Sequence, residues 1–66
     1  MYENLIKLLE ERGLTKYRLA KMSNISPQDL YTALNGYKPM YPGWRKRIAE
    51  ALEIPENVLF LEREES

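Results

Sequence analysis

The fold is decided by residues 14–36, which read LTKYRLAKMSNISPQDLYTALNG. Their pattern predicts two short helices, residues 16–22 and 27–34, held across a tight turn. The break between the helices falls at Ser23-Asn24, and Asn24 tolerates the left-handed backbone that such a turn requires. We expect the rest of the chain to be organised around this pair of helices.

The first helix of the pair has a clear start signal and an apolar side. Thr15 can cap it, and Leu14 before the cap can pack on Leu19 as a hydrophobic staple. The inward side of this helix is expected to consist of Leu19, Ala20 and Met22.

The second helix carries several start signals together. Ser26 is the expected cap, and Pro27 occupies the first helical position, where its missing N–H costs nothing. Asp29 can reach back as the second half of a capping box, which would turn its carboxylate inward, and Ile25 and Leu30 form the staple. The helix ends at Asn35-Gly36, where glycine is free to take a left-handed backbone.

Helical periodicity continues on both sides of this pair. Asn4 is a candidate cap for the first helix of the chain, and Gly13 a candidate stop. No strand pattern, repeat or low-complexity segment is found, so the sequence predicts one all-α domain. Its five short helices are expected at residues 4–12, 16–22, 27–34, 43–52 and 55–61, followed by an acidic tail at residues 62–66.

Length and composition restrict the possible functions. A chain of 66 residues has room for one small core and none for a roofed catalytic cleft. It contains no cysteine and no histidine, which excludes disulfides, thiolate chemistry and most zinc sites. No nucleophile–base pair, metal-ligand spacing or glycine-rich phosphate loop is present, so we expect neither an enzyme nor a cofactor. The absence of cysteine, of a signal-peptide pattern and of a long apolar run favours a cytoplasmic protein.

The charged residues are unevenly distributed although the formal net charge is zero. Residues 12–47 contain eight basic side chains and one acidic side chain, Asp29, which gives this segment a charge of +7. Residues 1–11 carry −2 and residues 48–66 carry −5. A basic middle between acidic ends suggests an anionic partner for the middle, with a merely solvated charged surface as the alternative.

The order and spacing of these motifs resemble the lambda-repressor-like, Cro/XRE-type helix-turn-helix domains, over about residues 4–60. The matching pieces are Leu14-Thr15-Lys16, Leu19-Ala20, Ile25-Ser26, Leu30, Asn35-Gly36, Ile48-Ala49, Ala51-Leu52, Ile54 and Leu59-Phe60. The resemblance implies a five-helix domain that binds double-stranded DNA and acts, usually as a dimer, in transcription control. The chain departs from the family pattern at Lys16, where glutamine is most frequent. It departs again at Pro27 and Thr32, which cannot hydrogen-bond guanine as arginine would.

Base contacts are expected from the second helix of the pair, because that helix enters the major groove in a helix-turn-helix. Its outer face should carry Gln28, Tyr31, Thr32 and Asn35, since positions i, i+3, i+4 and i+7 line up. Gln28 is the first candidate because its amide can pair with adenine N6 and N7. Thr32 can touch a thymine methyl or a base edge, Tyr31 can pack on sugar or cover the preceding helix, and Pro27 can touch a thymine methyl or serve only as a helix start.

Phosphate contacts should flank this helix. The candidates are polar or basic residues on neighbouring segments: Lys16, Asn35, Lys38, Tyr41 and Arg45. Trp44 is expected in the core. The remaining basic side chains of the two central helices and the next one, Arg18, Lys21 and Arg47, are expected on a solvated face.

The C-terminal apolar residues divide into two roles. Leu59 and Phe60 should close the core, whereas Val58 and Leu61 are left over for a dimer interface. Two reading helices one duplex turn apart, about 34 Å, would then fit a pseudo-palindromic operator.

Two functions remain open. The first is a sequence-specific regulator of transcription, a small repressor of the phage, plasmid or mobile-element type. The second is a protein-interaction module, such as an antitoxin or adaptor, that keeps the same fold, because a fold alone does not establish DNA binding.

Overall fold

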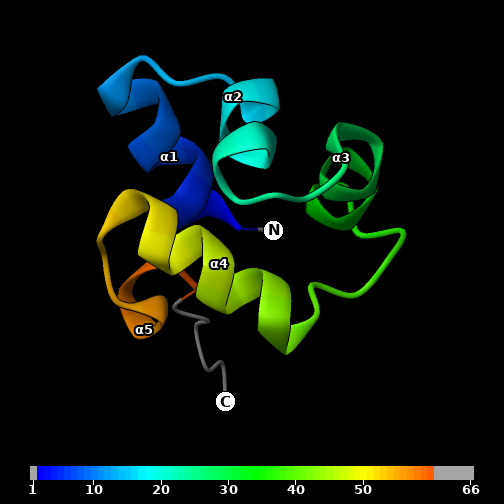
Figure 1. The fold of residues 1–66 in the computed structure, drawn as a ribbon. Helices are drawn as coiled ribbons and strands as arrows, with labels where there is room; N and C mark the ends of the chain where they lie inside the picture. The colour runs from blue at the N-terminus through cyan, green and yellow to red at the C-terminus, as the bar shows by residue number, and fades with distance from the viewer. Residues whose placement is uncertain (1, 61–66) are drawn as a thin grey trace.

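The computed structural model describes residues 2–60, and within them the chain is all-helical, with five helices and no strand. The helices pack around one apolar core, with α3 at one end of the molecule and α5 at the other (Figure 1). The five elements are α1 (Glu3–Arg12), α2 (Lys16–Met22), α3 (Pro27–Leu34), α4 (Pro42–Leu52) and α5 (Glu56–Leu59).

The helical periodicity of the sequence determines which side of each helix is buried. Every helix contributes leucine, isoleucine or alanine side chains to the core, while its polar side faces solvent. The buried apolar residues are Leu5, Leu9, Leu19, Ala20, Ile25, Leu30, Ala33, Leu34, Met40, Ile48, Ala49, Leu52, Leu59 and Phe60. Trp44 is half-buried against this core, in agreement with its prediction as a core residue.

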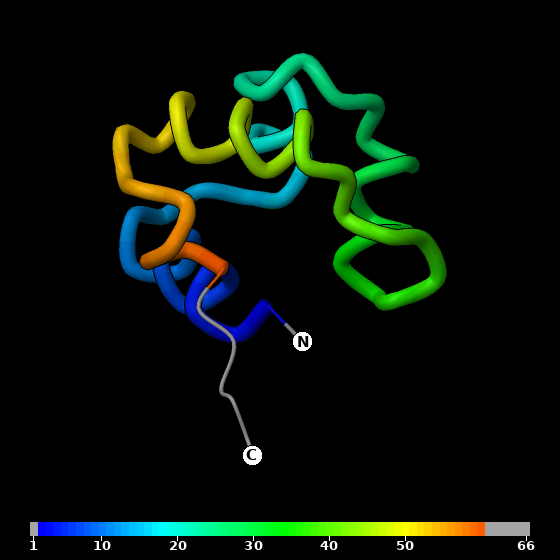
Figure 2. The backbone as a smooth tube through the Cα atoms, turned by 90° about the horizontal axis from the view of Figure 1, so that it is seen from below, coloured from blue at the N-terminus to red at the C-terminus, as the bar shows by residue number. Residues whose placement is uncertain are grey.

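The α3 helix is positioned mainly by α2. The α2 helix packs against both α3 and α4, and α5 packs against α4 and α1 (Figure 2). The reading helix of the predicted pair is therefore held from one side by α2. Its other side is left uncovered at the end of the molecule.

The turn between α2 and α3 has the predicted backbone. Asn24 has a φ of 58°, in the left-handed region, and the Thr15 hydroxyl accepts a hydrogen bond from the Arg18 N–H at 3.0 Å. The stop of α3 is also confirmed, because Gly36 has a φ of 87°. Arg47 is exposed as predicted, and it also donates from Nη1 to the Asn24 carbonyl at 3.1 Å, which ties α4 to this turn.

The prediction that Asn4 caps α1 is wrong. The helix begins at Glu3 after Tyr2, whose backbone is left-handed, and Asn4 lies inside the first turn. The Asn4 side chain donates to the Val58 carbonyl at 3.3 Å, and the Tyr2 ring meets Phe60 edge-on at 6.0 Å. The Asn4 side chain, which the sequence predicted as a helix cap, therefore binds α5, a segment distant in the sequence.

Met22 is the residue of α2 whose predicted side is wrong. Its side chain is exposed, whereas Leu19 and Ala20 are fully buried. At about 100° per residue, Met22 lies about 110° from the centre of the stripe formed by Leu19 and Ala20. Within this seven-residue helix, only Leu19 and Ala20 are buried in the core.

The last helix is shorter than the predicted 55–61. It runs from Glu56 to Leu59 with Pro55 at its N-cap, and Leu59 and Phe60 are buried as predicted. Leu61 and the predicted acidic tail, residues 62–66, lie outside the described residues.

Candidate nucleic-acid interface

The α3 helix presents a polar face away from the core. Its inner face consists of Leu30, Ala33 and Leu34, all buried as predicted. Its outer side carries the four residues predicted there, of which three are exposed and Thr32 is half-buried: Gln28, Tyr31, Thr32 and Asn35. A short rod with this division can enter a groove on one side while the other side stays anchored.

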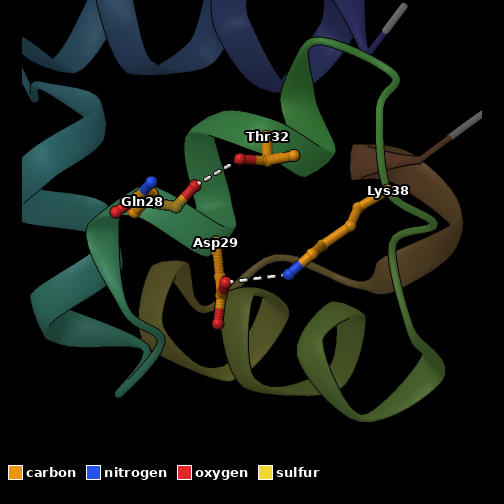
Figure 3. Close-up of polar contacts among 4 residues, drawn as sticks. All are labelled: Gln28, Asp29, Thr32 and Lys38. Atoms are coloured by element: carbon orange, nitrogen blue, oxygen red, sulfur yellow. Dashed lines mark hydrogen bonds and ion pairs between the residues drawn. The ribbon is translucent and has the colours of Figure 1, made fainter.

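The first turn of α3 does not form the predicted capping box. Ser26 occupies the N-cap position, but its side chain makes no capping hydrogen bond. Asp29 is turned away from the helix start and its Oδ1 accepts from Lys38 Nζ at 2.9 Å (Figure 3). The aspartate side chain is shorter than the glutamate that usually completes a capping box, and the ammonium of Lys38 lies within its reach.

The two polar side chains on the outer face of α3 differ in what they can still bind. Gln28 is exposed at the second position of the helix, and its amide group extends away from the ribbon (Figure 3). The Thr32 hydroxyl donates to the Gln28 carbonyl at 2.7 Å. Thr32 thus has its hydroxyl proton engaged within the helix and retains a methyl group and an acceptor lone pair for a ligand. Pro27 is half-buried at the first position of the helix, where its ring starts the helix.

An open groove joins the second half of α3 to the start of α2. It has a volume of about 560 Å³ and brings together three predicted contact residues, Lys16, Tyr31 and Asn35. The same groove is lined by residues from α1 and the α1–α2 connection: Ile6, Leu9, Glu10, Leu14 and Thr15. Lys16, a cation at one wall, and Asn35, an amide at the other, are suitable partners for a phosphate.

Tyr17 is a groove residue that sequence reasoning missed. Its side chain is 52% exposed, lines the same groove, and lies under Lys21 Nζ at 5.7 Å from the ring centre. The sequence signal was an aromatic residue directly after Lys16 at a helix start. A single exposed aromatic residue is common on protein surfaces, so this signal alone does not indicate a site.

The loop between α3 and α4 provides a second flank. Met40 is buried and anchors the loop, whereas Tyr37 at its start is 83% exposed. Tyr41, at the N-cap of α4, is exposed and its ring meets the Trp44 ring edge-on at 4.7 Å. The loop is anchored by Met40, its Lys38 contacts Asp29 of α3, and its Tyr41 packs on Trp44 of α4.

Arg45 is not grouped with the other predicted phosphate ligands. Its guanidinium lies over the Phe60 ring, 5.0 Å from the ring centre, and the side chain is half-buried. The predicted contacts therefore fall into three groups and two separate aromatic contacts. Lys16, Tyr31 and Asn35 line the groove, Pro27, Gln28 and Thr32 lie on α3, and Lys38 of the following loop is paired with Asp29. Tyr41 packs on Trp44, and Arg45 lies over Phe60.

The described residues hold neither a metal-binding cluster nor a membrane-spanning helix. Within residues 2–60, no three His, Cys, Asp or Glu side chains are grouped so that they could hold a metal ion. Over the same residues, no helix has the length and apolar character needed to cross a membrane.

Comparison with known families agrees with this geometry. The family model of the Cro/C1-type helix-turn-helix DNA-binding domain matches residues 4–57, most of the chain. The protein therefore belongs to the Cro/C1-type helix-turn-helix DNA-binding domain family, and its all-helical fold is the one expected for that family. Comparisons with curated proteins and with solved structures gave no match.

Proposed function

We propose that this protein is a sequence-specific regulator of transcription that reads the major groove of double-stranded DNA with α3. The observation that carries the proposal is the uncovered outer face of α3, with an exposed amide at its second position and a groove containing Lys16 and Asn35 beside it. In a helix-turn-helix the N-terminal part of the second helix contacts base edges. In this proposal Gln28 reads adenine, and Thr32, Tyr31 and Pro27 make the neighbouring contacts.

The phosphates would be held on both flanks of the reading helix. The groove with Lys16 and Asn35 supplies one flank, and the loop with Lys38 and Tyr41 supplies the other. Arg45 belongs to this set only if its guanidinium leaves the Phe60 ring on binding. Contacts of this kind fix the position of the protein on the duplex without specifying sequence.

The test of this function is selection from a pool of random duplexes, followed by sequencing of the bound fraction. A regulator should enrich one short motif, and a motif with two-fold symmetry would show two half-sites read by two chains. Binding should weaken steeply as salt rises, because phosphate contacts release counterions. A pool that shows no enrichment even at low salt would instead favour the interaction module, an antitoxin or adaptor.

Replacing Lys16 by Ala should weaken binding to all duplexes by a similar factor. The side chain lies at the edge of the groove and at the first position of α2, so its loss removes one phosphate contact and no base contact. We expect the slope of log K against log salt to become shallower by about 1. Binding isotherms at four salt concentrations, on the selected duplex and on a scrambled one, measure it; a change confined to the selected duplex would contradict the assignment.

A two-fold dimer would bring two reading helices onto one operator, and α5 offers a surface for it. Val58 is 52% exposed and borders a shallow groove of about 180 Å³ with Leu8 and Ile54, both half-buried. Leu61, the other residue predicted for this interface, lies outside the described residues. Exposed apolar side chains gathered on one face of a small domain are typical of an interface between copies.

Replacing Val58 by Asp should therefore convert a dimer into a monomer. A carboxylate at this position would replace an apolar contact and lose water in both copies of a symmetric interface, in a groove that Lys7 and Glu11 also line. Sedimentation velocity at several protein concentrations measures the change, and far-UV circular dichroism checks that the fold is kept. Val58→Ile is the matched control and should leave the sedimentation coefficient unchanged; equal values for wild type and Val58→Asp would remove α5 from the interface.

We further propose that this regulator is a repressor of the phage, plasmid or mobile-element type. Such a protein would act in the cytoplasm by occupying its operator, and it needs no cofactor. A reporter gene placed behind the selected motif tests this, because a repressor lowers expression and an activator raises it.

A further inference from the structure

Asp29 is an unusual residue for its position. It is the one acidic side chain among residues 12–47, which contain eight basic ones, and it lies in the first turn of the helix that we propose enters the major groove. A carboxylate near phosphates repels them. Its presence on this helix therefore requires a physical reason other than affinity for DNA.

The structure shows what this carboxylate contacts. Asp29 Oδ1 accepts from Lys38 Nζ at 2.9 Å, and the two side chains are 41% and 39% exposed (Figure 3). The capping role that would have explained Asp29 by helix stability alone is not used, because Ser26 and Asp29 form no capping box. The carboxylate is directed to the following loop, where it neutralises the one basic residue between α3 and α4.

We infer that Asp29 is a specificity-determining residue that keeps Lys38 from acting as a phosphate ligand. The inference rests on the proposed function and revises one of its assignments, since Lys38 then contributes little to backbone binding in the wild type. Contacts to phosphate strengthen binding to every sequence alike, whereas base contacts discriminate. While Asp29 holds the Lys38 ammonium, the base contacts of Gln28 and its neighbours contribute a larger fraction of the binding free energy.

The ion pair is suited to this role because it is partly exposed. Water and salt screen such a pair, so it restrains Lys38 without being a major support of the fold. A buried pair would instead have been part of the core, and its loss would have unfolded the helix. This role predicts that replacing Asp29 strengthens binding to non-selected duplexes and that replacing Lys38 weakens it. If the ion pair only held the loop in place, both replacements would weaken binding.

The experiment compares Asp29→Asn, Lys38→Gln and the double variant with the wild type, each on the selected duplex and on a scrambled duplex. In Asp29→Asn, Lys38 is released to bind phosphate, so affinity for the scrambled duplex should rise several-fold and the salt slope should steepen by about 0.9. The ratio of the two affinities should fall. Lys38→Gln should weaken binding to both duplexes, because Asp29 is left without its neutralising partner.

The double variant separates this inference from general charge effects. With neither charge present, its salt slope should return to that of the wild type, since no additional phosphate ligand is available. Glu56→Gln on α5 is the matched control: it changes the net charge by the same amount at the other end of the molecule, and it should leave the affinity ratio unchanged (Figure 1). Circular dichroism confirms that each variant is folded.

Two results would overturn the inference. If Asp29→Asn and Lys38→Gln both weaken binding and the salt slope of Asp29→Asn does not steepen, the pair only clamps the loop. If Glu56→Gln raises affinity for the scrambled duplex as much as Asp29→Asn does, net charge and not Lys38 is responsible. A wild type that binds no duplex is a different result, because it removes the proposed function itself before any variant is compared.

Discussion

Replacing Leu30 by Ala is expected to remove a large fraction of the stability of this protein and to weaken DNA binding through loss of folded protein. Leu30 is fully buried on the inner face of α3. Truncating a buried leucine to alanine costs about 2–5 kcal/mol through lost burial and the cavity that remains. A domain of this length has a free energy of unfolding of roughly 3–10 kcal/mol at about 0.05–0.15 kcal/mol per residue, so the loss is a large fraction of the total.

Urea denaturation followed by circular dichroism at 222 nm measures this effect as a shift of the midpoint to lower urea. Leu30→Met is the matched control on the same helix, because a swap that conserves volume costs less than about 1.5 kcal/mol. A midpoint for Leu30→Ala equal to that of the wild type would mean that α3 is not anchored by this side chain. The proposed reading helix would then have lost its support.

The sequence predicted those parts of the fold that depend on neighbouring residues. The bounds of α2 and α3, the Thr15 cap, the left-handed turn at Asn24 and the stop at Gly36 are all local, since each depends on residues within a few positions. The inner face of α3 followed from helical spacing alone. Such features can be predicted because the hydrogen bonds and backbone preferences that determine them involve residues within one or two helical turns.

Two of the incorrect predictions share a cause. Asn4 and Asp29 were each assigned from their own helix, and each is engaged by a distant segment instead, while the exposed Arg47 has a distant partner that was not predicted. Amide, carboxylate and guanidinium groups take the best available partner in the folded molecule, and a partner nine to 54 positions away cannot be read from local pattern.

The candidate site shows the same division. The exposure of Gln28, Tyr31 and Asn35 followed from the spacing on α3. The groove that joins Tyr31 and Asn35 to Lys16 depends on how α2 and α1 pack, so Tyr17 was not identified as part of it. A sequence therefore indicates which side chains are available, whereas the packing of helices decides which of them act together.

Replacing Gln28 by Ala should change which duplex the protein prefers. Gln28 is exposed at the second position of α3, where a helix-turn-helix makes its base contacts, and its amide can pair with both N6 and N7 of adenine. Loss of such a pair costs about 1–3 kcal/mol of discrimination at one base pair, and a symmetric dimer loses it in both half-sites. Random-duplex selection repeated with the variant should give a motif relaxed at one position of each half-site, with the other positions kept.

The matched control for this variant is Asn57→Ala, because Asn57 is another exposed amide but lies on α5, away from α3 (Figure 1). It should enrich the wild-type motif. Since Gln28→Ala removes no charge, its salt slope should also equal that of the wild type, which separates it from Lys16→Ala. If Gln28→Ala enriches an unchanged motif, the adenine contact does not exist, and discrimination must come from Thr32, Tyr31 or the shape of the duplex.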